Sequence, residues 1–485
     1  MRALLRLALP LAALSAFAYG CGAKGTLRPD LAPETTLFVN GAVDTVNHVV
    51  KLYWFGTDVD GTVSGYELRF LNPVAPADTN WVFTTRTDSV FTVPSPSGFA
   101  APVFEVRSVD NAGQRDPSPA RQDFSFSNQP PSVALTLKPG VNDTTFASVT
   151  VSWNANDPDG DGNLMQFRLW LDGNEANPEI TSARTFTMPT AQFRVAGALT
   201  SAYRKLYVQA IDDGGRGGNV DSVRWFVRKP TTGDRARLLI VDDVPTTNTS
   251  NARFDSLFTN NALRNIPPGE FSILRMQTNQ PFKSAKDVEQ TFKLFEAVMW
   301  YRANEITFST ILNNYQAGIG AYLDGGGKMY LEGLYLIAGL NGTGPLNEDF
   351  VPRYLNCDGM LKTFAITGSF SDSTIGWGNL NGSRFRSTVM ADSSRQQGFA
   401  SRTGEASGLR TFRVRDNDKV LLWALPGQLT PANPDSLPVG VIGDVAGGGR
   451  MILTTVPIST TIPPATGTAP RLLAKVLQLL GVLGP

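Results

Sequence analysis

The N-terminal half of this 485-residue chain repeats itself with a period near 100 residues. The segment Trp54–Gly61 (WFGTDVDG) recurs 99 residues later as Trp153–Gly160 (WNANDPDG). A second block, Phe104–Asp110 (FEVRSVD), matches Leu206–Asp212 (LYVQAID) at an offset of 102 residues. Two matched blocks in the same order indicate tandem copies of one domain.

Within each copy, short segments alternate apolar and polar residues, and turn clusters of Asp, Gly, Asn and Pro separate them. Tyr66–Phe70 and Phe167–Leu171 are examples. Alternation of this kind gives sheets with one buried face and one solvated face, and domains of this size and spacing are usually β-sandwiches. We therefore predict two all-β sandwiches, over residues 34–128 and 129–229.

The repeated blocks resemble bacterial fibronectin type III or immunoglobulin-like modules. The resemblance covers about residues 34–228 and makes Trp54 and Trp153 the core tryptophans of an early strand. Modules of this class serve mostly as spacers or binders, so the resemblance informs the fold and names no ligand.

Both copies place aspartates in the turn that follows the repeated tryptophan. Asp157, Asp159 and Asp161 match the first half of a calcium loop, and Asp58 and Asp60 form a shorter version in the first copy. The glutamate that closes such a loop is missing, because an arginine occupies the twelfth position. Two interpretations remain: a calcium ion that stiffens each sandwich, or tight turns that need only Asp and Gly. The sequence indicates no other cofactor.

From residue 235 to residue 485 the pattern changes to continuous apolar runs that alternate with amphipathic helices. Leu238–Val241, Phe271–Met276 and Ala297–Tyr301 are predicted strands, and a helix with an apolar stripe leads to a further strand at Met329–Leu331. Strand and helix in alternation predict an α/β domain with a mostly parallel sheet and helices on both faces. The remaining expectations are a helix that includes Phe254, long loops over 341–408, a helix near 347–355, strands at 420–423 and 451–455, and a last helix over 472–480.

The stretch Gly325–Gly333 (GGGKMYLEG) resembles the nucleophile strand of class I glutamine amidotransferase-like domains, and more closely their trehalose-utilisation-type relatives. The resemblance implies a flavodoxin-like fold over residues 235–485 and places Glu332 at the elbow, where the family holds its reactive group. Acyl transfer of this type needs a thiolate and a histidine base. The single histidine, His48, lies in the first sandwich, and Cys357 lies well past the elbow. A Cys–His or Ser–His triad is therefore excluded inside this domain.

Four charged residues remain as candidates for catalysis in this domain. Asp242 and Asp243 follow the first strand, Arg302 follows a neighbouring strand, and Glu332 ends the elbow strand, so all four are expected at the carboxyl edge of the sheet. Paired carboxylates perform general acid–base chemistry and hydrolyse glycosides. The alternative is structural: Asp243 caps a turn, backbone amides hold Glu332, and Arg302 neutralises both.

The N-terminus predicts export and anchoring. The apolar run Leu7–Ala18, with arginines before it, has the length of a signal peptide and is too short to span a bilayer as a helix. Ala18–Cys21 (AYGC) resembles a bacterial lipobox, which implies removal of residues 1–20 and lipidation of Cys21. The alternative is an ordinary secretory signal. Residues 21–33 are expected to form a tether.

Two functions follow from these features. Basic and acidic residues number 43 each, which disfavours a nucleic-acid partner.

The first hypothesis is a non-catalytic lipoprotein of the bacterial cell envelope, anchored through its lipid and facing the periplasm or the cell surface. Its partner would be a glycan, a peptide or an envelope protein. The second is a secreted hydrolase that acts on glycans or peptides through Asp243 and Glu332. Convergence of these two side chains in an open cleft would favour the second.

Overall fold

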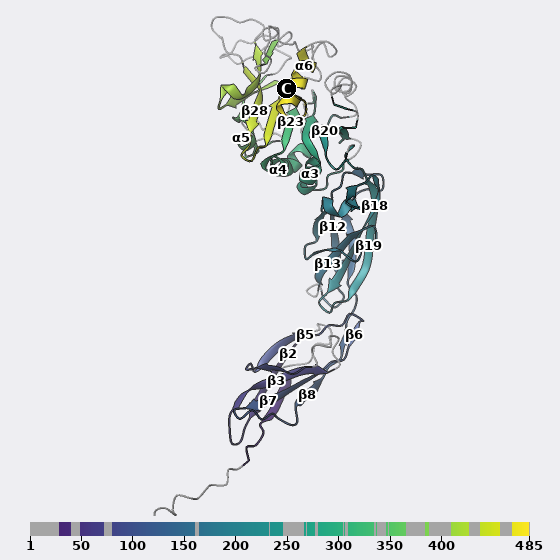
Figure 1. Cartoon of the computed structure of the whole chain (residues 1–485), viewed down its shortest axis with the longest axis vertical. Coiled ribbons are helices and arrows are strands. Elements are labelled where there is room, and N and C mark those ends of the chain that lie inside the picture. The colour runs from purple at the N-terminus through teal and green to yellow at the C-terminus, as the bar shows by residue number, and fades with distance from the viewer. Residues whose placement is uncertain are drawn as a thin grey trace, which may run out of the picture. The chain divides into compact units, whose positions relative to one another are not determined.

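The computed structural model describes most of the chain, and most of the described part is β-sheet (Figure 1). The described residues are 29–39, 49–71, 80–160, 164–231, 233–245, 266–267, 269–276, 280–303, 305, 309–333, 336, 346–347, 349–364, 384–387, 409–425, 437–455 and 468–484. The chain divides into two compact units. The first is Met1–Pro131 with Asn156–Met165 and Ile211–Gly218, and the second is Ser132–Ala155 with Gln166–Ala210 and Asn219–Pro485.

The first β-domain is built from antiparallel sheets around one aromatic core. Its sheets are β1 (Glu34–Val39), β2 (Val49–Thr57) and β5 (Asp88–Thr92); β4 (Val82–Thr84), β3 (Val63–Leu71), β7 (Val103–Asp110) and β8 (Ala120–Asp123); and β6 (Phe99–Ala100) with β9 (Phe126–Ser127). Trp54 is buried between Tyr66 and Phe104, and its indole Nε1 donates to the Arg86 carbonyl at 2.8 Å. The predicted role of Trp54 as a core tryptophan is confirmed.

The second β-domain repeats this sandwich arrangement. One sheet contains β10 (Ser132–Leu137), β12 (Val149–Asn156) and β15 (Thr185–Met188), and β16 (Arg194–Val195) pairs with β17 (Ala198–Leu199). The other contains β11 (Thr144–Thr145), β19 (Gly217–Val227), β18 (Ala202–Asp212), β13 (Leu164–Leu171) and β14 (Glu179–Thr181). Trp153 is buried against Phe167, as predicted from the repeat. Burial along β18 alternates residue by residue, which is the period that the sequence pattern predicts for a half-buried strand.

The C-terminal domain contains an eight-stranded mixed sheet. Its order is β21 (Phe271–Arg275), β20 (Ala236–Asp242), β22 (Phe295–Tyr301), β23 (Lys328–Glu332), β29 (Arg450–Thr454), β28 (Leu437–Asp444), β27 (Val420–Leu425) and β25 (Arg384–Ser387). The first five strands pair in parallel and the last three join antiparallel. A separate antiparallel pair consists of β24 (Cys357–Phe364) and β26 (Leu409–Val414).

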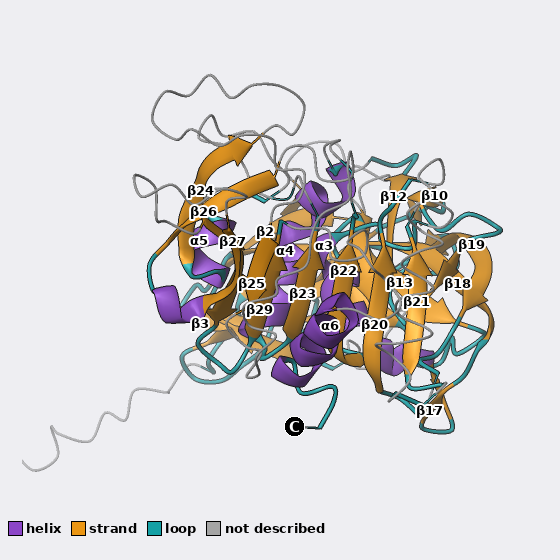
Figure 2. Ribbon diagram, turned by 90° about the horizontal axis from the view of Figure 1, so that it is seen from above, coloured by secondary structure: helices purple, strands orange, loops and turns teal. Residues whose placement is uncertain are grey.

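Helices cover both faces of this sheet (Figure 2). The described α-helices of the domain are α3 (Ala285–Phe292), α4 (Thr310–Asp324), α5 (Phe350–Tyr354) and α6 (Thr468–Leu479). Leucines of α6 pack in one cluster with Met299 of β22 and Tyr330 of β23. On the opposite face, Phe292 of α3 contacts Trp300 of β22 and Tyr322 of α4. Successive strand residues point to opposite faces, so the neighbours Met299 and Trp300 lie on opposite faces of the sheet.

Two expectations for this domain need correction. Part of the segment expected to form long loops is strand, because Cys357–Phe364 forms β24 and Arg384–Ser387 forms β25. The sheet is also less parallel than predicted, since it continues from β29 into three antiparallel strands. Of these three strands, β27 was predicted from its apolar run, whereas β28 carries two glycines and a proline and β25 has only four residues, so their apolar signal is weak. The expected helix that includes Phe254 lies outside the described residues.

Candidate functional site

Asp243 lies directly after β20 and is fully buried, with 0% of its side chain exposed. Its Oδ2 accepts hydrogen bonds from Arg302 Nη1 at 2.7 Å, Ser309 Oγ at 2.8 Å and Trp300 Nε1 at 3.2 Å. Ser309 is also the N-cap of α4, where its Oγ accepts from the Leu312 amide. The carboxylate therefore joins the end of one strand to the next strand and to the start of a helix.

Glu332 ends β23 and is also fully buried. The Tyr330 hydroxyl donates to Glu332 Oε2 at 2.9 Å and lies 3.0 Å from Thr454 Oγ1 of β29. Burial, followed by the adjacent Glu332 carboxylate, raises the pKa of Tyr330 well above its ordinary value. Tyr330 therefore stays a neutral donor that holds the carboxylate inside the sheet. Backbone atoms join the same edge, because the Arg302 amide donates to the Glu332 carbonyl at 2.8 Å.

The candidate carboxylates share one edge of the sheet but not one face. Asp242, Tyr301 and Glu332 lie in register on adjacent strands, as predicted for the carboxyl edge. Asp242 binds Arg275 at 2.8 Å. Asp243 contacts Trp300, whose ring packs toward α3, whereas Glu332 contacts Tyr330, whose ring packs toward α6.

Asp243 and Glu332 therefore do not converge in one cleft, and the hydrolase hypothesis stays a prediction. The two side chains reach opposite faces of the sheet, and each is enclosed among hydrogen-bonding partners. The structural interpretation is closer, with one change. Arg302 forms an ion pair with Asp243, and Glu332 accepts a hydrogen bond from a tyrosine hydroxyl. The sequence can predict that a residue lies at the end of a strand. The face of the sheet to which its side chain points depends on the exact residue at which the strand ends.

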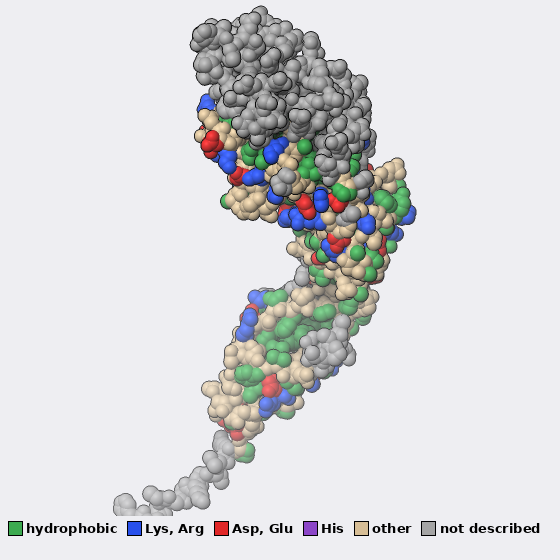
Figure 3. All heavy atoms as spheres, turned by 45° about the horizontal axis from the view of Figure 1, so that its top comes forward, with side chains coloured by type: hydrophobic (Ala, Val, Ile, Leu, Met, Phe, Trp, Pro, Cys, Tyr) green, Lys and Arg blue, Asp and Glu red, His purple; other side chains and the backbone are tan. Residues whose placement is uncertain are grey.

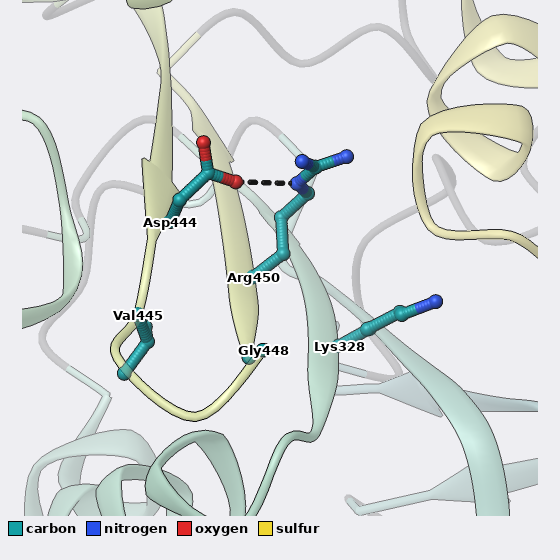
Figure 4. Close-up of a pocket in the computed structure, with 6 residues that line it drawn as sticks. Lys328, Asp444, Val445, Gly448 and Arg450 are labelled. Atoms are coloured by element: carbon teal, nitrogen blue, oxygen red, sulfur yellow. Dashed lines mark hydrogen bonds and ion pairs between the residues drawn. The ribbon is translucent and has the colours of Figure 1, made fainter.

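A pocket of about 420 Å³ opens at the other end of the same strands (Figure 4). Lys328 begins β23 and Arg450 begins β29, and both side chains border it with the glycine turn that precedes Arg450. Asp444 pairs with Arg450 at 2.7 Å and with Lys419 at 2.6 Å. Lys419, and then Arg450, hold the pKa of Asp444 below its ordinary value. Among the described residues, Lys328 has no ion-pair partner, so this pocket has a cationic wall that the sequence analysis did not identify.

The aspartate turns of the two β-domains adopt the same local structure. The Asp60 amide donates to Asp58 Oδ1 at 3.3 Å, and the Asp159 amide donates to Asp157 Oδ1 at 2.9 Å. Asp161 lies outside the described residues. Within the described ranges, no group of three or more His, Cys, Asp or Glu side chains is placed to hold a metal ion. The calcium interpretation of these turns therefore stays a prediction.

An exposed aromatic face lies on the sheet of β1, β2 and β5. Phe38 and Phe55 are 48% and 43% exposed, and their rings stack at 5.4 Å between centroids. Val90 of β5 is 56% exposed on the same sheet. Figure 3 shows hydrophobic side chains gathered over the first β-domain. Contiguous exposed apolar side chains can mark an interaction site, so this face is a candidate for binding.

Cys21 lies outside the described residues, so lipidation stays a prediction. None of the helices in the described ranges combines the length and the apolar character needed to cross a membrane.

Comparisons with known proteins give similarity at the level of solved structures. No family model matches the sequence, and no curated protein matches it. The chain is similar to the fibronectin(III)-like modules of Clostridium thermocellum CbhA, at 18% identity over 40% of this chain and 94% of that chain, with a TM-score of 0.19. It is also similar to the FN1–FN3 domains of chicken CNTN1, at 15% identity over 41% of this chain and 68% of that chain, with a TM-score of 0.20.

Proposed function

We propose that this chain is an exported, lipid-anchored protein of the bacterial cell envelope that binds a partner without catalysing a reaction. The observation that carries the non-catalytic part of the proposal is the enclosure of Asp243, which is fully buried with Arg302, Trp300 and Ser309 all donating to one carboxylate oxygen. A general acid or base must reach the substrate within hydrogen-bond distance. A carboxylate enclosed in this way is out of reach of a substrate and has a structural role.

The C-terminal domain is proposed to be an amidotransferase-like domain that lacks the catalytic residues. The parallel order β21-β20-β22-β23-β29, with helices on both faces, supports this assignment. So does the position of Glu332 at the end of β23. A carboxylate is a far weaker nucleophile than a thiolate, and the Glu332 carboxylate accepts a hydrogen bond from the Tyr330 hydroxyl.

The first two domains are proposed to display this domain away from the membrane and to offer a binding surface. The signal-like run Leu7–Ala18 and the lipobox-like Cys21 support export and anchoring. The stacked rings of Phe38 and Phe55 support binding of a glycan, a peptide or an envelope protein by the first domain.

Replacement of Glu332 tests the proposal. Glu332→Gln keeps the shape of the side chain and weakens the acceptor for the Tyr330 hydroxyl, so we expect unfolding to become easier by about 1–3 kcal/mol. Both forms should show no turnover of glycan or peptide libraries. The measurements are urea unfolding and a product screen by mass spectrometry.

The matched control is Glu296→Gln, because Glu296 is exposed on the neighbouring strand β22. We expect this change to alter stability by no more than about 0.5 kcal/mol. Turnover by the wild-type protein that disappears in Glu332→Gln, with stability unchanged, would favour the hydrolase hypothesis in a form that uses Glu332 without Asp243.

A further inference from the structure

Each β-domain buries an aspartate at the end of a central strand, and neither aspartate was identified from the sequence. Asp110 ends β7 and Asp212 ends β18, and the repeat aligns the two positions. Each residue is only 2% exposed. The alternation that buries Val106 and Val208 continues to the last residue of each strand, so it turns the carboxylate inward.

The two oxygens of each carboxylate differ in their hydrogen bonding. Asp110 Oδ1 accepts from the amides of Ala112 and Gln114 at 2.8 Å, and Asp212 Oδ1 accepts from the Arg216 amide at 2.7 Å. The Oδ2 atoms of Asp110 and Asp212 are buried and have no hydrogen-bond partner among the described residues. Burying a carboxylate oxygen without a hydrogen-bond donor or a cation costs free energy. Both copies bear this cost at the equivalent aspartate, which calls for an explanation.

The aspartate turn of each domain lies beside this position. In the first domain, a Cβ atom added at Gly61 would meet both Asp58 Oδ2 and Asn111 Oδ1, so oxygens from the turn and from the residue after Asp110 approach one point. Asp58 Oδ2 is also buried without a hydrogen-bond partner among the described residues. No basic side chain forms an ion pair with Asp58, Asp110 or Asp212 in the part of the chain that the structure describes.

The second domain repeats this arrangement. The repeat places Asp157 at the position of Asp58 and Asp212 at the position of Asp110. Asp157 is 4% exposed and Asp212 is 2% exposed, so both carboxylates are buried at the equivalent turn and strand end. A divalent cation at this position would offset the cost of burying the two charges.

We propose that each β-domain holds one Ca²⁺ ion between its aspartate turn and the buried aspartate that ends the central strand. The protein oxygens are those of Asp58 and Asp110 in the first domain and of Asp157 and Asp212 in the second. Ca²⁺ prefers hard oxygen ligands from carboxylates, amides, carbonyls and water in a flexible geometry. With two carboxylates in each site, carbonyl oxygens and water complete the coordination, and the affinity falls near the range of extracellular modules, about 10⁻⁴–10⁻³ M.

This proposal is independent of the proposed function and changes the sequence-based site. Ligands come from two loops that are about 50 residues apart, rather than from one loop. Asp60 and Asp159 are occupied elsewhere, because Asp60 accepts from the Leu31 amide and Asp159 accepts from the Gln129 amide. The sequence motif contains the aspartates of the turn but not the aspartate that ends the central strand.

The test uses the purified full-length protein in detergent, with Ca²⁺ itself as the probe. Equilibrium dialysis against millimolar Ca²⁺ should find two ions per chain, and Ca²⁺ should raise the melting temperature by several degrees over the value in chelator. Asp110→Asn and Asp212→Asn should each retain one ion, and the double variant should retain none. Asparagine keeps the shape and removes the charge, so both variants should fold and should melt in chelator no lower than the wild-type protein.

The matched control is Asp116→Asn. Asp116 is as buried as Asp110, but both of its oxygens are occupied, by the Thr35 amide and by Ser118. This variant should melt at a lower temperature and still bind two ions. Dialysis that finds no Ca²⁺ on the wild-type protein, or two ions on the Asp110→Asn, Asp212→Asn double variant, would overturn the proposal.

Discussion

Arg302→Met should lower the free energy of unfolding of the C-terminal domain by about 3–5 kcal/mol. Arg302 and Asp243 are 4% and 0% exposed, and Nη1 lies 2.7 Å from Oδ2. Removal of the guanidinium leaves a buried carboxylate with the neutral donors Ser309 and Trp300 and no counter-charge at this contact. The measurements are urea unfolding and hydrogen exchange of peptides from β20 and β22.

Two comparisons isolate the cause of this loss. Arg302→Met combined with Asp243→Asn should recover a large part of it, because the double variant leaves no charge buried. Lys419→Met removes an equally short contact, 2.6 Å to Asp444, from an exposed pair of the same domain, and it should cost no more than about 1 kcal/mol. A loss for Arg302→Met as small as the loss for Lys419→Met would show that the buried pair contributes little, and it would remove the main support for a structural role of Asp243.

The two sandwiches could be predicted because their signal is local. Alternation with period two determines which residues of β7 and β18 point inward, and the repeat identifies Trp54 and Trp153 as equivalent core positions. The strands β20 and β22 were found for a similar reason, since continuous apolar runs of strand length indicate burial on both faces.

The arrangement of the candidate site could not be predicted in the same way. Asp243 and Glu332 were expected at one edge, and they are there, but a shift of one residue past a strand end exchanges one face of the sheet for the other. Asp110 and Asp212 show the converse. Both stood in the repeated blocks of the sequence, yet a carboxylate that ends a strand looks like an ordinary turn residue until its burial and its missing donor are known.

Cys21→Ser should move the protein from the membrane fraction to the soluble fraction almost completely. Under the lipobox interpretation, the acyl chains on Cys21 are the anchor, and each buried methylene of those chains contributes about 0.8 kcal/mol to membrane binding. Serine has no thiol to acylate. The measurement is fractionation of cells that express either form, with a salt wash to remove proteins held by charge alone.

Cys357→Ser is the matched control, because the chain has two cysteines and Cys357 is buried in the C-terminal domain. This variant should stay in the membrane fraction and incorporate labelled fatty acid as the wild-type protein does, whereas Cys21→Ser should incorporate none. Retention of Cys21→Ser on membranes after the salt wash would mean that a protein surface provides the attachment. The exposed aromatic face around Phe38 and Phe55 would then be the first surface to examine, because lipid would no longer explain how the protein is held.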